Sequence, residues 1–349
     1  MKTTFISTAA MATSRYDSMA KLQRQMSDLQ VELSTGRHAD IGLELGNQIG
    51  ESISLRAEQT KLDGLLKTNA LISNRFDLLQ ASMAEIGEIA DSFVDSMIAL
   101  RDNPQKADLA VAQAQNSLEE LTAKMNVSYG GQYILAGINT DQPPMNQYSA
   151  TPASAAKTSL DAAFFAEFGF TQSDPAVASI SSGAMDTFLN GAFSNLFDST
   201  GWDADWTNAS TDRQQQQIDT GQFMDIGPTA QERAFAELTS AFAMVADLGA
   251  ENMNATTFSA TLERAVETAA TAQEKLNTLR SINGFSEERL ARADKSIELK
   301  LNFMDQRLSA LEGVDAYETS TQLSNVLNAL EISYAVTGKI QSLSLVRYI

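Results

Sequence analysis

The sequence predicts a mainly α-helical protein, with long antiparallel coiled-coil helices from both chain ends and a small β-containing domain inserted between them in the sequence. Two observations predict this class. Apolar residues recur at three- and four-residue intervals near both ends of the chain and along two long inner stretches, and this period is lost between about residues 142 and 227. A stripe with that spacing is one face of a helix, and it has to be buried against other helices.

Narrow apolar stripes mark the helices at the two ends of the chain. The stripe near the start is made of Met19, Leu22, Met26, Leu29 and Leu33, and the stripe near the finish is made of Leu323, Leu327, Leu330 and Tyr334. Stripes of this width cannot form a globular core alone. We therefore predict that these side chains are assembly residues, whose apolar surface is covered when neighbouring copies of the chain pack together.

The longest regular element is predicted from Leu62 to Leu100, where the three–four alternation is unbroken. At 1.5 Å per residue this helix would be roughly 60 Å long, which fits a coiled-coil rod. Asn69 is the one polar residue in its stripe. It either sets the register of the coiled coil or is a solvated side chain at a frayed edge of the seam.

A second rod helix and a strand are predicted next. Asn103 suits an N-cap and Pro104 suits the first helical turn, so a helix is expected to begin there and to end at Gly130-Gly131. The short run 132–135 lies between glycine-rich turns. This predicts a strand that forms one half of a hairpin.

Residues 142–227 form the segment that lacks a helical period. Proline, glycine and small polar residues interrupt it, while both tryptophans and several phenylalanines fall within it. Aromatic residues in short segments between turns predict a small domain with its own core, more β than α. Eleven acidic residues from Asp141 to Asp225, against only Lys157 and Arg213, give a net charge of −9, which suits a solvated outer surface.

Helices are predicted again after this segment. Thr229 and Glu232 have the spacing of a capping box, which predicts a helix start. The stripe over 258–279 predicts the next rod, and further along the stripe resumes with a phase shift that is typical of a stutter. Asp315 together with Glu318 predicts the start of the last helix.

The predicted layout is nested, because a hairpin of helices with one enlarged loop gives this order of elements. The expected segments are 1–45, the N-terminal half of a terminal coiled-coil domain; 46–141, the N-terminal part of a helical rod domain; 142–227, the inserted, aromatic-rich, acidic outer domain; 228–300, the C-terminal part of the rod domain; and 301–349, the C-terminal half of the terminal coiled-coil domain.

Composition narrows the classes of partner. The net charge is −19, and phosphate binding needs clustered Lys and Arg, so no nucleic-acid partner is expected. No apolar run reaches transmembrane length and none marks a cleaved signal, so no membrane insertion is expected. The chain has no cysteine, which removes disulfides, thiolate metal sites and cysteine nucleophiles.

The residues also argue against an enzyme. His38 is the only histidine, and no catalytic motif surrounds it. Asp203 and Asp205 could supply oxygen ligands to calcium, but the glycine and terminal Glu of an EF-hand are missing, so an acidic loop is the preferred interpretation. We expect no catalytic residue, no cofactor and no metal site.

Two short motifs resemble those of a known family, the bacterial flagellins and their relatives. Ser34-Thr35-Gly36-Arg37, after the first stripe, is similar to the Ser-Thr/Ser-Gly-basic motif of the family. The stretch Gly131-Gln132-Tyr133-Ile134-Leu135-Ala136-Gly137 is similar to a Gly-x-Tyr-x-Phe/Leu-Ala-Gly pattern of one branch. After Arg37 the sequence departs from the family, whose members commonly continue into an Asp-Asp-Pro-like loop.

The resemblance implies a structural component of the bacterial flagellum. It would assemble at the junction between hook and filament through coiled-coil packing of its terminal helices; the alternative is flagellin, the filament subunit itself, which generally lacks the strand motif. The implied partners are like subunits in a ring, an adjacent hook-associated protein, flagellin, and an export chaperone on the C-terminal helix. Export through the flagellar type III apparatus needs no cleaved signal, so the implied location is extracellular.

Overall fold

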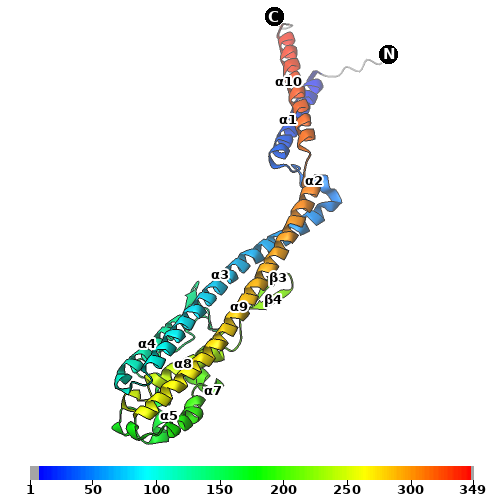
Figure 1. The fold of residues 1–349 in the computed structure, drawn as a ribbon. Coiled ribbons are helices and arrows are strands. Elements are labelled where there is room, and N and C mark those ends of the chain that lie inside the picture. The colour runs from blue at the N-terminus through cyan, green and yellow to red at the C-terminus, as the bar shows by residue number, and fades with distance from the viewer. Residues whose placement is uncertain (1–7, 347–349) are drawn as a thin grey trace. The chain divides into compact units, whose positions relative to one another are not determined.

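The computed structural model describes residues 8–346, which divide into two compact units (Figure 1). The terminal unit contains the described residues of Met1–Gly64 and Ser296–Ile349, and the central unit is Leu65–Lys295. Two long helices, α3 (Ile49–Leu100) and α9 (Ala255–Glu312), have residues in both units. The terminal unit is therefore built from segments that lie far apart in the sequence. The predicted fold class, mainly helical with a small β part, is confirmed.

Four helices form the framework of the central unit: α3, α4 (Ala107–Met125), α8 (Arg233–Ala246) and α9. The Ser82 hydroxyl of α3 donates to the Lys124 carbonyl of α4 at 2.7 Å, and the Phe93 ring of α3 lies 4.7 Å from the Phe242 ring of α8. Nearly every residue of α8 is buried, because its alanines and phenylalanines allow close packing on all sides. This helix lies inside the bundle.

The predicted helix Leu62–Leu100 lies within α3, which begins earlier, at Ile49. As predicted, Asn103-Pro104 separates α3 from the next helix: a 3₁₀ turn, η2 (Pro104–Lys106), leads directly into α4. Proline is tolerated there because the first residues of a helix have no intrahelical acceptor for their N–H groups.

Asn69 is fully buried in the stripe of α3, so the solvated alternative is wrong. Its side-chain amide donates to the Ile218 carbonyl at 2.8 Å and to Asp294 Oδ1 at 2.6 Å. The first bond reaches strand β3 (Gln215–Asp219) and the second reaches α9. A buried polar group with specific partners fixes the alignment of the elements that carry those partners.

The predicted hairpin is present directly after α4. Strands β1 (Ser128–Tyr129) and β2 (Gln132–Tyr133) pair antiparallel. Gly130 and Gly131 form the turn with φ values of 60° and 83°, a conformation that favours glycine. The ladder is shorter than predicted, because Ile134 and Leu135 leave it and are buried in the core.

The inserted segment has far more helix than strand, so the expectation of more β than α is wrong. Its elements are α5 (Ala155–Phe168), η3 (Pro175–Ser179), α6 (Ser182–Phe188), η4 (Leu189–Phe193), α7 (Ser199–Gly201), η5 (Trp202–Trp206), β3 (Gln215–Asp219) and β4 (Gln222–Asp225). Strands β3 and β4 form one antiparallel hairpin, which is the only sheet in this segment.

The aromatic side chains of the insert do not form a core of their own. Trp202 and Trp206 are buried in the same apolar cluster as the framework helices, and the Trp202 indole N–H donates to the Ala230 carbonyl at 2.9 Å. A chain of ring contacts continues from Trp206 through Phe197 to Phe193. Short helical turns bury too little surface alone, so they pack onto the neighbouring helices.

The expected capping box at Thr229 does not start a helix. The N-cap of α8 is Glu232, which makes no capping bond and instead pairs with Arg213 at 2.6 Å. The Thr229 hydroxyl accepts from the Gln231 N–H at 3.3 Å, within a turn that precedes the helix. A short turn, η6 (Ala250–Asn252), then leads to α9, which continues unbroken to Glu312.

Gly137 holds a position that only glycine fits. Its φ is +64°, and a Cβ atom there would lie 2.6 Å from the Asp212 carbonyl oxygen and 2.7 Å from that of Ser210. By contrast, Gly131 has a φ of +83° but nothing within 4 Å of an added Cβ. A side chain at Gly131 would therefore meet backbone strain alone, whereas one at Gly137 would meet both strain and a steric clash.

We expect Gly137→Ala to destabilise the protein by more than about 2 kcal/mol, because left-handed strain and the clash add. Gly131→Ala is the matched control, with a loss of about 1–2 kcal/mol from strain alone. Chemical denaturation followed by circular dichroism measures both. Equal losses for the two variants would contradict the close approach at Gly137.

Candidate assembly site

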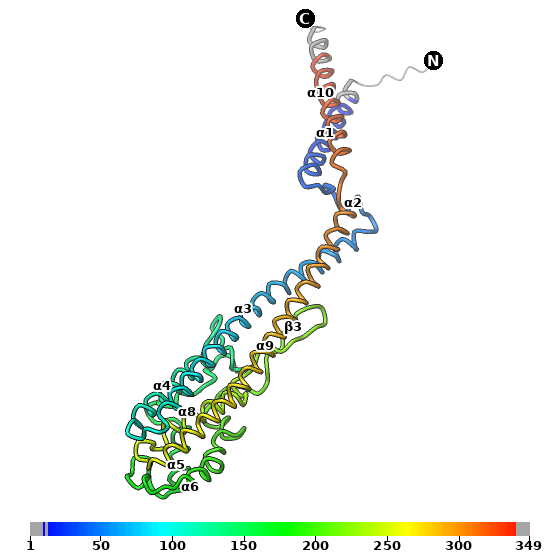
Figure 2. The backbone as a smooth tube through the Cα atoms, in the orientation of Figure 1, coloured from blue at the N-terminus to red at the C-terminus, as the bar shows by residue number. Residues whose placement is uncertain are grey.

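The two ends of the chain pair with each other in the terminal unit (Figures 1 and 2). This unit contains α1 (Thr8–Thr35), α2 (Ile41–Leu45), η1 (Gly46–Gln48) and α10 (Ala316–Val346), with parts of α3 and α9. The Gln23 amide donates to the Tyr334 hydroxyl at 2.8 Å, and Arg37 forms a backbone bridge with Gly313. These pairings show that α1 and α10 run antiparallel.

The predicted assembly residues fall into three groups by exposure. Leu29 and Leu330 are buried, with exposed fractions of 9% and 5%. Leu327 and Tyr334 remain 45% and 52% exposed. Leu33 is exposed as well. The remaining residues of the two stripes are half-buried: Met19, Leu22, Met26 and Leu323. Each stripe therefore lies partly against the other terminal helix and partly on the open surface.

Further apolar side chains that the stripes did not include are also exposed on these helices. They are Tyr16 and Val31 on α1 and Tyr317, Ile332 and Val336 on α10. Ile332, which is 64% exposed, and Val336 are four residues apart and share one face of α10. A pair of helices can cover only one face of each, so these faces remain uncovered. The four-residue spacing of Ile332 and Val336 in the sequence could have predicted this second apolar face.

A joint connects the two terminal helices to the rest of the terminal unit. Gly36, with a φ of +69°, ends α1, and its carbonyl accepts from the Val314 N–H at 3.1 Å. The His38 N–H donates to the Glu312 carbonyl at 2.9 Å. The loop after α1 and the loop before α10 are thus tied to each other by their backbones.

The Glu312 carboxylate lies at the centre of this joint, with no exposed side-chain surface. It accepts hydrogen bonds from the Ser52 hydroxyl and from two guanidinium nitrogens of Arg56, with Nε at 3.0 Å. Arg37 Nη1 lies 3.9 Å away. A two-bond contact with a guanidinium fixes orientation as well as charge, so Glu312 holds the start of α3 against the end of α9.

The pKa of Glu312 is lowered. Burial of the carboxylate raises it, but the hydrogen bonds from Arg56 and Ser52 and the positive charges of Arg56 and Arg37 outweigh burial. A carboxyl whose folded pKa lies below its unfolded value stabilises the fold above the unfolded value, near 4.3, and loses that contribution as the pH falls through the folded pKa.

The first family motif belongs to this joint. The hydroxyls of Ser34 and Thr35 both donate to the Val31 carbonyl, at 2.9 and 2.8 Å, and close the last turn of α1. After Arg37 the chain enters α2, where Asp40 is the N-cap and accepts from the Leu43 N–H at 2.9 Å.

The second motif, Gly131–Gly137, lies in the central unit and links distant segments through its backbone. The Leu135 carbonyl accepts from the Ala230 N–H at 2.8 Å, and the Ala136 carbonyl accepts from the Ser210 N–H at 3.0 Å. The motif therefore fixes the position of the chain that precedes α8.

No cation or membrane site is found in the described residues. None of the helices in residues 8–346 is long and apolar enough to cross a bilayer. Over the same residues, no three or more His, Asp and Glu side chains are grouped so that they could hold a metal ion. His38 Nδ1 lies 3.6 Å from a Glu32 oxygen, a half-buried contact that is an ion pair only when the imidazole is protonated.

Paired chain ends, a buried joint and a surplus of apolar helix surface define a structural protein built to associate. Residues 6–140 match the family model of the bacterial flagellin N-terminal helical region, and residues 265–349 match that of the bacterial flagellin C-terminal helical region. Together these cover more than half of the chain. The chain belongs to the bacterial flagellin family, and its role is structural, in the flagellum.

Other comparisons concern the fold. No curated protein sequence matches the chain. A solved structure from Vibrio parahaemolyticus, described as a flagellar hook-associated protein, is similar with a TM-score of 0.51 and 11% sequence identity. The similarity covers 74% of this chain and 95% of that one. At this identity the likeness concerns the fold alone.

We expect Glu312→Gln to destabilise the terminal unit by about 1–3 kcal/mol at neutral pH, because Arg56 loses its charged partner. The difference from the unchanged protein should shrink as the pH falls below about 4. Hydrogen exchange of the His38 and Val314 amides measures it, since both N–H groups donate across the joint.

Glu44→Gln is the matched control, because Glu44 is exposed on α2 and has no ion pair in the described part of the chain. It should leave these exchange rates unchanged. Equal effects of the two variants, or a Glu312→Gln effect that grows on acidification, would show that the buried carboxylate does not hold the joint.

Proposed function

We propose that this protein assembles at the junction between the flagellar hook and filament through packing of its terminal helices. The observation that carries the assembly mechanism is the exposed apolar surface of the α1–α10 pair, of which Leu327, Ile332 and Tyr334 are examples. Burying one leucine or isoleucine side chain stabilises an association by about 1.5–3 kcal/mol. Several such side chains per subunit therefore favour association of like subunits, in a ring in this proposal.

The junction assignment is supported by two further observations. The Gly131–Gly137 stretch is similar to a pattern of the junction branch, and Gly137 occupies a position that needs glycine. The Vibrio parahaemolyticus protein with a similar fold is described as hook-associated. In this proposal the partners are like subunits in a ring, an adjacent hook-associated protein and flagellin, and a chaperone holds the C-terminal helix before export.

Location follows from the same proposal. The protein leaves the cell through the flagellar export route without a cleaved signal and becomes part of the external flagellum. Residues 1–45 and 301–349 form the inner coiled-coil domain, 46–141 and 228–300 form the rod, and the acidic residues 142–227 face outward.

Flagellin itself is the second candidate, because both family models describe the helical regions that flagellin shares. Location separates the two candidates. Immunogold labelling of intact flagella should mark a single point between hook and filament for a junction protein. Labelling along the whole filament would contradict the junction assignment and support flagellin.

Loss of the gene gives an independent test. Without a junction protein, hooks should remain while filament subunits are released into the medium. A strain that keeps full filaments, or that loses filament subunit altogether, would contradict the proposal.

We expect Leu327→Asp to reduce incorporation into flagella by about tenfold or more, because it places a charge where a neighbour would pack. The α1–α10 pair should survive, since this side chain is already half exposed. Leu330→Asp should instead break the pair itself, because Leu330 is buried in the isolated chain. Hydrogen exchange reports on the pair, and electron microscopy reports on incorporation.

The comparison of the two variants is decisive for the assembly surface. If Leu327→Asp incorporated as well as the unchanged protein, the exposed face would not be an interface. If Leu330→Asp left hydrogen exchange in α1 unchanged, the pairing of the chain ends would be wrong.

A further inference from the structure

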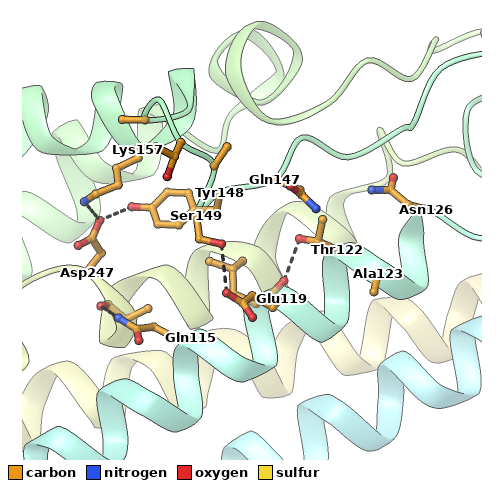
Figure 3. Close-up of a pocket in the computed structure, with 15 residues that line it drawn as sticks. Gln115, Glu119, Thr122, Ala123, Asn126, Gln147, Tyr148, Ser149, Lys157 and Asp247 are labelled. Carbon is orange, nitrogen blue, oxygen red and sulfur yellow. Dashed lines mark hydrogen bonds and ion pairs between the residues drawn. The ribbon is translucent and has the colours of Figure 1, made fainter.

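A cavity of about 840 Å³ lies in the central unit (Figure 3). One wall is the side of α4 from Gln115 to Ala123 together with the C-cap Asn126, and the segment 147–153 lies along it. Lys157 of α5 and Asp247, directly after α8, close one end. Ligand pockets commonly measure about 300–1,000 Å³, so this cavity is large enough for more than water.

At the Asp247 end of the cavity, the charged side chains already pair with one another. Lys157 Nζ lies 2.6 Å from Asp247 Oδ2 and 3.2 Å from Asp161 Oδ1, so two carboxylates share one ammonium group. The Tyr148 hydroxyl also donates to Asp247. Burial, reinforced by the charge of Asp247, raises the pKa of Tyr148, so this hydroxyl stays protonated.

Glu119 differs from these groups because no cation in the described part of the chain pairs with it. It lies at the middle of the α4 wall, and one of its oxygens accepts a hydrogen bond from the Ser149 hydroxyl at 3.1 Å (Figure 3). The lining contains Glu119 and Asp247 against Lys157 alone. Since Lys157 is already shared by two carboxylates, the cavity keeps an excess of negative charge at Glu119.

The rest of the lining suits a side chain with a long apolar stem and a neighbouring amide. Leu118, Ala123 and Ala150 contribute apolar groups to the lining. Gln147 points into the cavity and its side-chain amide makes no hydrogen bond within the part of the chain that the structure describes (Figure 3). A free amide offers one donor group and one acceptor, which match the groups of a peptide bond.

We propose that this cavity binds a peptide segment that presents a lysine or arginine side chain, with the cation at Glu119, its methylene stem along the apolar wall, and a peptide group of the segment at Gln147. Lysine and arginine bury their stems on apolar surface while the charged end keeps polar contacts. The site is independent of where in the flagellum the protein resides.

Binding is tested on the full-length chain with blocked alanine pentapeptides that carry lysine, arginine or norleucine at the centre. Norleucine keeps the stem of lysine and removes the charge. Isothermal titration calorimetry should detect the two basic peptides and give binding weaker by up to about fivefold for norleucine, the most that one solvent-accessible ion pair supports. Affinity for the basic peptides should fall with added salt, because exposed charges are screened.

Glu119→Gln places the test on one residue, because it removes the charge and keeps an oxygen for the Ser149 hydroxyl. It should weaken binding of the lysine peptide by about fivefold. Glu120→Gln is the matched control: it makes the same change on the next residue of α4, which is exposed and does not line this cavity. Circular dichroism melting shows whether both variants stay folded.

Three results would overturn the proposal. They are no detectable binding of either basic peptide, equal binding of the norleucine peptide, and equal loss of affinity in the Glu119→Gln and Glu120→Gln proteins. Binding of the lysine peptide that depends on charge and on Glu119 supports it. None of these measurements depends on filament assembly, so the outcome is separate from the location of the protein in the flagellum.

Discussion

The need to cover apolar surface on long, thin helices is the constraint on which this structure depends. In the central unit, α3, α4, α8 and α9 cover one another, and the aromatic turns between them close the remaining gaps. In the terminal unit, α1 and α10 pack along each other over the described residues, so faces such as that of Ile332 and Val336 on α10 stay in water. A two-helix pair has no interior, whereas a bundle does. The same physical requirement thus gives a finished core in one unit and, in the proposed function, an interface in the other.

Much of the helical framework could be predicted from the sequence, because long periodic stripes and strong end signals are local properties. The stripe of Leu62–Leu100 and the break at Asn103-Pro104 are both found in the structure. The partners of Asn69 could not be predicted in the same way. Ile218 and Asp294 lie 149 and 225 positions away, and nothing near Asn69 indicates either of them. The Glu312 joint has the same character, since Arg56 is 256 positions away.

The insert shows where local signals mislead. Small polar residues between aromatic runs favour turns and strands, yet Asp174, Ser181 and Asp198 each accept a hydrogen bond from the backbone of a short helical turn that follows. The same residue types favour a turn and an N-cap, and the length of the apolar run did not separate the two. On α10, assigning the leucines to one face left Ile332 and Val336 unassigned, although a helix can carry two apolar faces.

The pairing of the chain ends also has a consequence for synthesis. Gln23 and Tyr334 are separated by 311 positions, so α1 has no partner until nearly the whole polypeptide has left the ribosome. An amphipathic helix without a partner is only marginally stable in water. Throughout most of translation the apolar face of α1 is therefore exposed and can bind other proteins non-specifically. Any cellular factor that shields this face has to act before α10 has been synthesised.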